Sequence, residues 1–68
     1  MKSLTGKEFC RLLNKKGWEL KRVKGSHYIF AKGTPSARIS VPVHGNKTLK
    51  QGLQRHLMKI AGIDESEL

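Results

Sequence analysis

Residues 18–30, WELKRVKGSHYIF, decide the fold of this chain. Strand-favouring side chains lie on both sides of Gly25 and Ser26, and a two-residue Gly-Ser connection is typical of a type II′ β-hairpin. Antiparallel pairing across that turn places Lys24 opposite His27. The stretch therefore predicts two antiparallel strands with a lysine and a histidine side by side at the turn end.

A third strand is predicted after the hairpin. Residues 32–37 contain the Gly, Pro and Ser of a turn, and residues 38–41 then alternate between polar and apolar side chains until Pro42 stops the pattern. The three strands together predict an antiparallel meander.

The first helix begins with a local signal. Thr5 and Glu8 have the spacing of a capping box, in which each side chain satisfies a backbone N–H of the first turn. Gly17 suits the left-handed position that follows a helix end. We expect this helix over residues 5–16.

Apolar residues at helical spacing predict a second helix that runs up to Ala61. They are Leu49, Leu53, Leu57 and Ile60. Gly62 caps this helix, and Ile63 supplies the apolar residue of a Schellman ending. Residues 64–67 resemble a further capping box, but so short a segment is expected to remain a frayed acidic tail.

The length of the chain limits its organisation. With 68 residues, of which 37% are apolar, it has room for one hydrophobic core. We therefore expect one domain over residues 1–68, with an acidic C-terminal tail at 64–68. The predicted class is α+β in the order α-β-β-β-α, a three-stranded antiparallel sheet with both helices packed on one face.

The charge balance indicates a polyanionic partner. Lys and Arg total 14 against 5 Asp and Glu, and the formal net charge is +9 at pH 7. Phosphate neutralisation and counterion release favour nucleic acid. An anionic membrane surface is the competing polyanion, but the apolar faces are needed for the core. No apolar stretch has the length of a membrane span or a signal-peptide core, so we expect an intracellular, cytoplasmic protein.

Cations are the candidates for RNA binding. Three recur on one side of the first helix and the others are spread over strands and loops: Lys7, Arg11, Lys15, Arg22, Lys24, Lys32, Arg38 and Lys47. Trp18, Tyr28 and Phe30 can stack on unpaired bases, but at least two of them are expected in the core.

His27 is the candidate for catalysis. The Gly25-Ser26 turn holds this histidine at the strand end. The positive charge of Lys24 would attract a phosphate and favour a neutral imidazole, and Arg22 would add to both effects if it lies on the same face. RNA has its own nucleophile in the 2′-hydroxyl, so its cleavage needs only a proton acceptor, a proton donor and charge stabilisation. From these residues alone, an ordinary strand histidine is the simpler interpretation.

The other reactive side chains form weaker patterns. His44, in the loop after the third strand, can donate a proton only if that loop folds against His27. His56 is expected at the surface of the second helix. Cys10 belongs to the apolar side of the first helix, and Ser26 lacks the acidic partner of a catalytic triad. The three histidines do not have a metal-ligand spacing, so no metal site is predicted.

Several segments together resemble one protein family. They are Thr5-Gly6-Lys7-Glu8, Gly17-Trp18, Lys24-Gly25-Ser26-His27, Val41-Pro42, His44-Gly45-Asn46-Lys47, Leu49-Lys50 and Ala61-Gly62-Ile63. In this order, over nearly the whole chain, they are similar to the HicA-type toxins, also called YcfA-like. Family members usually have Gly-Thr-Leu where this chain has Gly52-Leu53-Gln54, so the second helix is expected to begin earlier here.

The resemblance implies a double-stranded-RNA-binding-domain-like fold and the activity of an mRNA interferase, the toxin of a type II toxin–antitoxin system. It implies that His27 is catalytic, as general acid or base, with Lys24, Gly25 and Ser26 supporting the site. A HicB-like antitoxin is the expected partner, covering His27 and the basic surface. No metal, cofactor or small-molecule ligand is expected.

Two other functions fit the charge equally well. A non-catalytic RNA-binding module of the same fold type reads A-form RNA by shape and phosphate contacts, and its binding should survive loss of His27. A purely structural basic subunit should show little affinity for free RNA, so retention of RNA at modest salt separates these two functions.

Overall fold

The computed structural model describes residues 2–33 and 37–68, and it confirms the predicted order of helices and strands. The elements are α1 (Gly6–Lys15), β1 (Glu19–Lys24), β2 (His27–Lys32), β3 (Ala37–Pro42), α2 (Gln51–Ala61) and a final 3₁₀ turn, η1 (Glu65–Glu67). Residues 34–36 of the predicted turn at 32–37 lie outside the described residues. None of the helices in the described part of the chain is long and apolar enough to cross a membrane.

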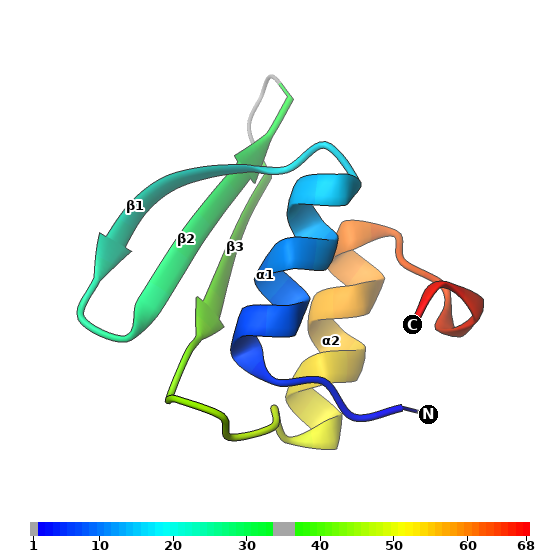
Figure 1. The fold of residues 1–68 in the computed structure, drawn as a ribbon. Helices are drawn as coiled ribbons and strands as arrows, with labels where there is room; N and C mark the ends of the chain where they lie inside the picture. Colours follow the sequence, from blue (N-terminus) through cyan, green and yellow to red (C-terminus); the bar gives the residue numbers. More distant parts are fainter. Residues whose placement is uncertain (1, 34–36) are drawn as a thin grey trace.

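The sheet is an antiparallel meander with strand order β1-β2-β3, as predicted. Phe30 lies opposite Ile39 and Tyr28 lies opposite Val41. Phe30, Ile39 and Val41 are at most 1% exposed, because α1 and α2 cover this side of the sheet (Figure 1). The architecture is the predicted α+β class with both helices on one face, and it is consistent with a double-stranded-RNA-binding-domain-like fold.

The core takes side chains from both helices and from the sheet. Phe9 and Leu13 of α1 are fully buried, and Leu57 of α2 is 4% exposed. Trp18 and Phe30 also belong to this core, which confirms that at least two of the aromatic residues have a packing role. Burial of such large side chains is the main source of stability in a chain of this size.

Helix α1 begins and ends as its sequence predicts. The Thr5 hydroxyl accepts a hydrogen bond from the Glu8 N–H at 3.1 Å, and the Glu8 carboxylate accepts one from the Thr5 N–H at 2.9 Å. This reciprocal pair is the predicted capping box. At the other end, Gly17 has a φ of 93°, so it occupies the left-handed position that glycine favours.

Helix α2 confirms its predicted ending. Gly62 has a φ of 69°, and the Ile63 N–H donates to the Met58 carbonyl at 3.0 Å, as in a Schellman motif. The helix begins at Gln51, ahead of Gly52, which agrees with the expected early start.

The buried side of α2 differs from the prediction at two positions. Ile60, expected on the apolar side, is 43% exposed, whereas Gln54 is completely buried. The Gln54 side chain accepts a hydrogen bond from the Leu4 N–H at 2.9 Å and donates one to the Lys2 carbonyl at 2.7 Å. Because the N-terminal segment lies against α2, its backbone groups need polar partners there, and Gln54 provides them.

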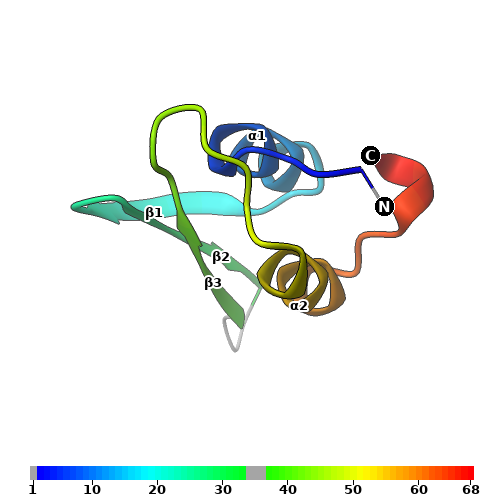
Figure 2. The same cartoon turned by 90° about the horizontal axis from the view of Figure 1, so that it is seen from below.

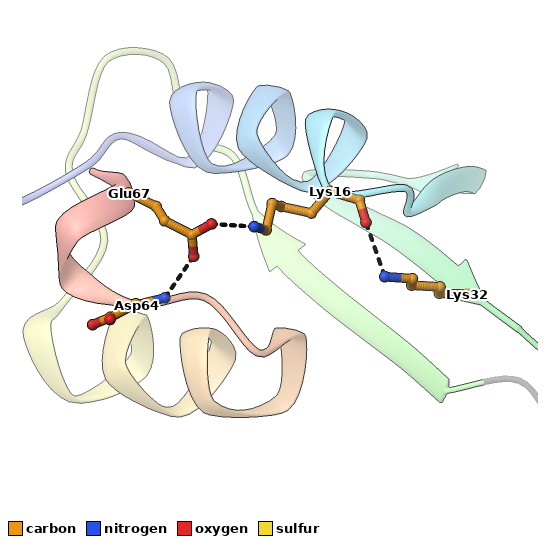
Figure 3. A network of polar contacts seen from close by, with 4 residues as sticks. All are labelled: Lys16, Lys32, Asp64 and Glu67. Carbon is orange, nitrogen blue, oxygen red and sulfur yellow. Dashed lines mark hydrogen bonds and ion pairs between the residues drawn. The ribbon is translucent and has the colours of Figure 1, made fainter.

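The acidic tail is ordered, so the prediction of a frayed end is wrong. Asp64 and Glu67 form their own capping box around η1. The Glu67 carboxylate also pairs with the Lys16 ammonium at the end of α1 and accepts a hydrogen bond from the Asp64 N–H (Figure 3). Leu68 packs against the core. A cation on α1 and an apolar contact therefore hold a segment that is too short to be stable alone.

Candidate active site

The β1–β2 hairpin presents His27 at its turn. Gly25 has a φ of 59°, and no described residue other than glycine has a positive φ, so Ser26 completes the combination of a type II′ turn. Lys24 lies opposite His27, as predicted. The His27 side chain is exposed, which leaves the imidazole accessible to a ligand.

A β-bulge in β1 determines which residues share a side with His27. Leu20 lies opposite Phe30, but Arg22, and not Lys21, lies opposite Ile29. The two-residue turn places Lys24 opposite His27. The bulge then lets Leu20 and Val23, three positions apart, face the same side of the sheet, opposite Phe30 and Tyr28. The sequence signal for the bulge is the three-residue step from Leu20 to Val23 in the apolar pattern, where a regular strand would have a step of two.

The sheet has one side that both helices leave uncovered, here called the open face (Figure 2). Successive residues of a strand alternate between the two sides, and directly paired residues share a side. Since Tyr28 and Phe30 face the helices, His27 and Ile29 belong to the open face. Pairing then adds Lys24 to the same side.

Three cations share this face with the imidazole, at increasing distance from it along the strands. Arg22 lies opposite Ile29, Lys24 lies opposite His27, and Arg38 lies opposite Ala31. We call Arg22, Lys24 and Arg38 the open-face cations. All three side chains are exposed, and none forms an ion pair with another described residue. Uncompensated positive charge beside a histidine is suited to hold a phosphate.

The other predicted RNA-binding residues lie elsewhere. Lys7, Arg11 and Lys15 are exposed on α1, which packs on the opposite side of the sheet from the open face. The Lys32 ammonium donates a hydrogen bond to the Lys16 carbonyl at 2.9 Å, so this cation satisfies the C-terminal end of α1 (Figure 3). Lys47 lies in the loop between β3 and α2. Of the predicted RNA-binding residues, the structure therefore places Lys24 directly opposite His27, and Arg22 and Arg38 further along the same face.

The loop after β3 starts next to the hairpin turn. Pro42 lies opposite His27, and the Val43 N–H donates to the Ser26 carbonyl at 2.7 Å. Gly6 of α1 packs directly against this point: a Cβ atom there would collide with the Pro42 carbonyl oxygen. His44 follows two residues after Pro42 and is exposed. The site thus lies where the hairpin turn, the end of β3 and the start of α1 meet.

The comparison with protein families identifies the chain. Residues 6–63 match a family model described as the HicA toxin of bacterial toxin-antitoxin. The chain belongs to the HicA toxin family. No curated protein matches it at a significant level. The HicA match includes the hairpin with His27, the loop after β3 and both helices, and it supports the role of a toxin with an antitoxin as its general partner.

The remaining reactive groups of this HicA-family chain lie away from the hairpin turn. Cys10 is half-buried on α1, and burial raises its pKa to about 11, so at neutral pH it is a protonated thiol and not a nucleophile. His56 is exposed on α2, as predicted. Among the described residues there is no group of three or more His, Cys, Asp or Glu side chains that is able to hold a metal ion.

Proposed function

We propose that this HicA-family toxin is an mRNA interferase that cleaves RNA with His27 as general acid or base. The observation that carries the proposal is the exposed His27 directly opposite Lys24, on a sheet face that also bears Arg22 and Arg38, neither of which forms an ion pair with a described residue. Positively charged groups bring the phosphate backbone to the imidazole and stabilise charge that develops during the reaction. In this role the protein acts in the cytoplasm, where mRNA is found.

The proposed reaction uses the nucleophile of the RNA itself. The 2′-oxygen forms a bond to phosphorus while the bond to the 5′-oxygen of the next nucleotide breaks. His27 either accepts the proton from the 2′-hydroxyl or donates a proton to the leaving 5′-oxygen, and water exchanges the other proton. Lys24 stabilises the negative charge on the phosphorane-like transition state. The products are a 2′,3′-cyclic phosphate and a 5′-hydroxyl, and no step requires a metal ion.

The proposed inhibitor is a HicB-like antitoxin that covers this hairpin. An acidic surface would neutralise the open-face cations and exclude RNA from His27. Leu20 and Val23, on the other side of the same hairpin, are 45% and 49% exposed, so a protein that encloses the hairpin would also bury apolar area. A stable complex with the protein of the adjacent reading frame that still cleaves RNA would contradict this masking mechanism.

The test compares two histidine variants in RNA cleavage. Wild-type protein, His27→Ala and His56→Ala are incubated with a long single-stranded RNA in excess EDTA, and the fragment ends are analysed. His56 is the matched control, because it is exposed on α2, away from the open face. We expect His27→Ala to lose at least about 100-fold in rate, as is usual for removal of a general acid or base, and His56→Ala to keep its activity.

The outcome also separates catalysis from simple binding. Circular dichroism confirms that all three proteins are folded. If the folded wild-type protein binds RNA and leaves it uncut, the proposal of an interferase fails, and a non-catalytic RNA-binding module is the function to pursue. Equal losses in His27→Ala and His56→Ala would show that the effect is not specific to the open face.

A further inference from the structure

A cavity of about 320 Å³ lies between the end of β3 and the first turn of α2. Apolar residues line part of it, and polar residues, two of them lysines, line the rest. The apolar residues are Pro42, Leu49 and Leu53, and the polar ones are His44, Lys47, Thr48 and Lys50. Among the described residues, no Asp or Glu lines this cavity. Neither the catalytic proposal nor the core packing accounts for a hollow with this lining.

The cavity is adjacent to His27 through one shared residue. Pro42 lines the cavity and is also the direct cross-strand partner of His27. The hydrogen bond between the Val43 N–H and the Ser26 carbonyl continues this pairing into the loop. His27 belongs to the open face and α2 lies on the covered side of the sheet (Figure 2). An RNA strand whose reacting phosphate lies at His27 would therefore reach this cavity by passing around the end of β3 at Pro42.

The walls of the cavity are held in place by the start of the chain. The Leu49 N–H donates to the Leu4 carbonyl at 2.7 Å, and Thr5 and Thr48 form an isolated β-bridge. On the other side, the Lys47 N–H donates to the His44 carbonyl at 3.0 Å. A loop fixed at both ends keeps its cavity open before a ligand arrives, which lowers the entropy cost of binding.

The lining matches the chemistry of a single nucleotide. Small-molecule pockets start at about 300 Å³, so the space suits one ring system rather than a large ligand. Pro42, Leu49 and Leu53 offer apolar contact to the flat face of a base, and His44 offers a ring for stacking. Lys47 and Lys50 offer charge to its phosphate. The first turn of α2 has no side-chain cap, so its free N–H groups add positive potential at the same edge.

We propose that this cavity binds one unpaired base of the RNA next to the cleaved phosphate, with Lys47 and Lys50 holding the phosphate of that nucleotide. The proposal rests on the RNA cleavage proposed above and extends it by a base-binding subsite. The cavity then positions the strand over His27 and contributes to the choice of cleavage site.

The test measures binding of RNA from which one base has been removed. The probe is a short single-stranded RNA that contains the mapped cleavage site, with a 2′-deoxy sugar at the cleaved nucleotide so that it stays intact. An abasic nucleotide is moved along this RNA one position at a time, and the Kd is measured by fluorescence anisotropy. Stacking of one base predicts a loss of roughly tenfold in affinity at a single position next to the cleavage site and little change elsewhere.

Protein variants test whether the loss of affinity caused by the abasic nucleotide arises at the cavity. Leu53→Trp fills the cavity from its apolar side and His44→Ala opens its polar side; either variant should bind the intact and abasic RNA with nearly equal affinity. Two independent variants keep the test valid if one of them fails to fold. Lys47→Ala and Lys50→Ala should weaken binding of every RNA, whereas Lys59→Ala, the same charge change at an exposed position near the end of α2, should have a smaller effect.

The possible results separate the two proposals. If cleavage depends on His27 but no abasic position weakens binding, or if the cavity variants keep the full abasic penalty, the base-binding subsite is overturned and the interferase proposal remains. If the wild-type protein cleaves no RNA, the abasic scan is made on a short RNA that it binds. A single sensitive position that the cavity variants remove would then leave the base-binding cavity standing, while the interferase proposal fails. Cavity variants that bind RNA normally but lose affinity for the antitoxin would show a protein contact there, which also overturns the subsite.

Discussion

The two helices begin in opposite ways, although each has a glycine in its first turn. Helix α1 starts with the Thr5 capping box, and Gly6 is so close to the Pro42 carbonyl that no Cβ atom fits. Helix α2 has Lys50 at its N-cap position, where the side chain makes no capping hydrogen bond, and a Cβ atom at Gly52 would meet nothing within 4 Å. The start of α1 is therefore capped and tightly packed, whereas the start of α2 is uncapped and has free space around Gly52.

This difference shows how the site is held. The start of α1 packs on the end of β3, beside the partner of His27, so it acts as the fixed support of the loop. The start of α2 is instead positioned from a distance, through the hydrogen bonds of Gln54 to the N-terminal segment. Its first backbone N–H groups have no side-chain acceptor. The packed helix start therefore gives rigidity, and the open one leaves polar groups available to a ligand.

The largest expected effect comes from the matched substitutions Gly6→Ala and Gly52→Ala. Gly6→Ala drives a methyl group into the Pro42 carbonyl and should lower the free energy of unfolding by about 3 kcal/mol. Gly52→Ala removes a flexible residue from a helix without any clash and should raise it by about 0.5–1 kcal/mol. Urea denaturation of both variants measures their free energies of unfolding. If both substitutions lowered it, or both raised it, the two helix starts would not differ in packing as described.

The second effect concerns the buried amide that positions α2. Gln54→Met has a similar shape but leaves the Leu4 N–H and the Lys2 carbonyl without their partner, so it should lower the free energy of unfolding by about 2 kcal/mol. Gln51→Met is the control, since Gln51 is exposed at the first position of the same helix. Hydrogen exchange should become faster at the Leu4 amide in Gln54→Met only. Unchanged exchange there would show that the amide does not anchor the N-terminal segment.

The smallest effect is expected from removing the N-cap side chain of α1 and adding one to α2. Thr5→Ala should lower the free energy of unfolding by about 1 kcal/mol, because the Glu8 N–H loses its acceptor. Lys50→Ser should raise it by up to about 1 kcal/mol, because it gives α2 the cap that it lacks. Thermal unfolding at neutral pH measures both changes.

The contribution of the capping box at the start of α1 should depend on pH, because it includes the carboxylate of Glu8. The hydrogen bond from the Thr5 N–H holds the pKa of Glu8 below its ordinary value. A lowered carboxyl pKa in the folded state stabilises the fold above the unfolded pKa, and that contribution is lost as the pH falls through the folded pKa. The deficit of a Glu8→Ala variant should therefore be present at neutral pH and shrink as the pH falls below the ordinary Glu pKa of about 4.3, while the gain from Lys50→Ser should persist. A deficit that does not change with pH would contradict an ionised Glu8 in the cap.

The family assignment and the geometry of the hairpin were both accessible from the sequence. The Gly25-Ser26 turn predicted that Lys24 lies opposite His27, and the structure confirms that register. The catalytic role of His27 stays a prediction, because the position of an imidazole beside a cation permits proton transfer without demonstrating it. The cavity was not predicted, since its lining comes from a strand end, a loop and a helix that only the folded chain brings together.

The sequence by itself determined the features that depend on near neighbours: the capping box of Thr5 and Glu8, the hairpin turn and the Schellman ending at Gly62. Their hydrogen bonds join residues a few positions apart, so the local pattern is sufficient. Only the tertiary structure decided the burial of Gln54, the docking of the acidic tail and the division of the cations between α1 and the open face. These outcomes depend on which surfaces meet across long stretches of chain, and a polar side chain becomes a core residue only where a distant backbone needs its hydrogen bonds.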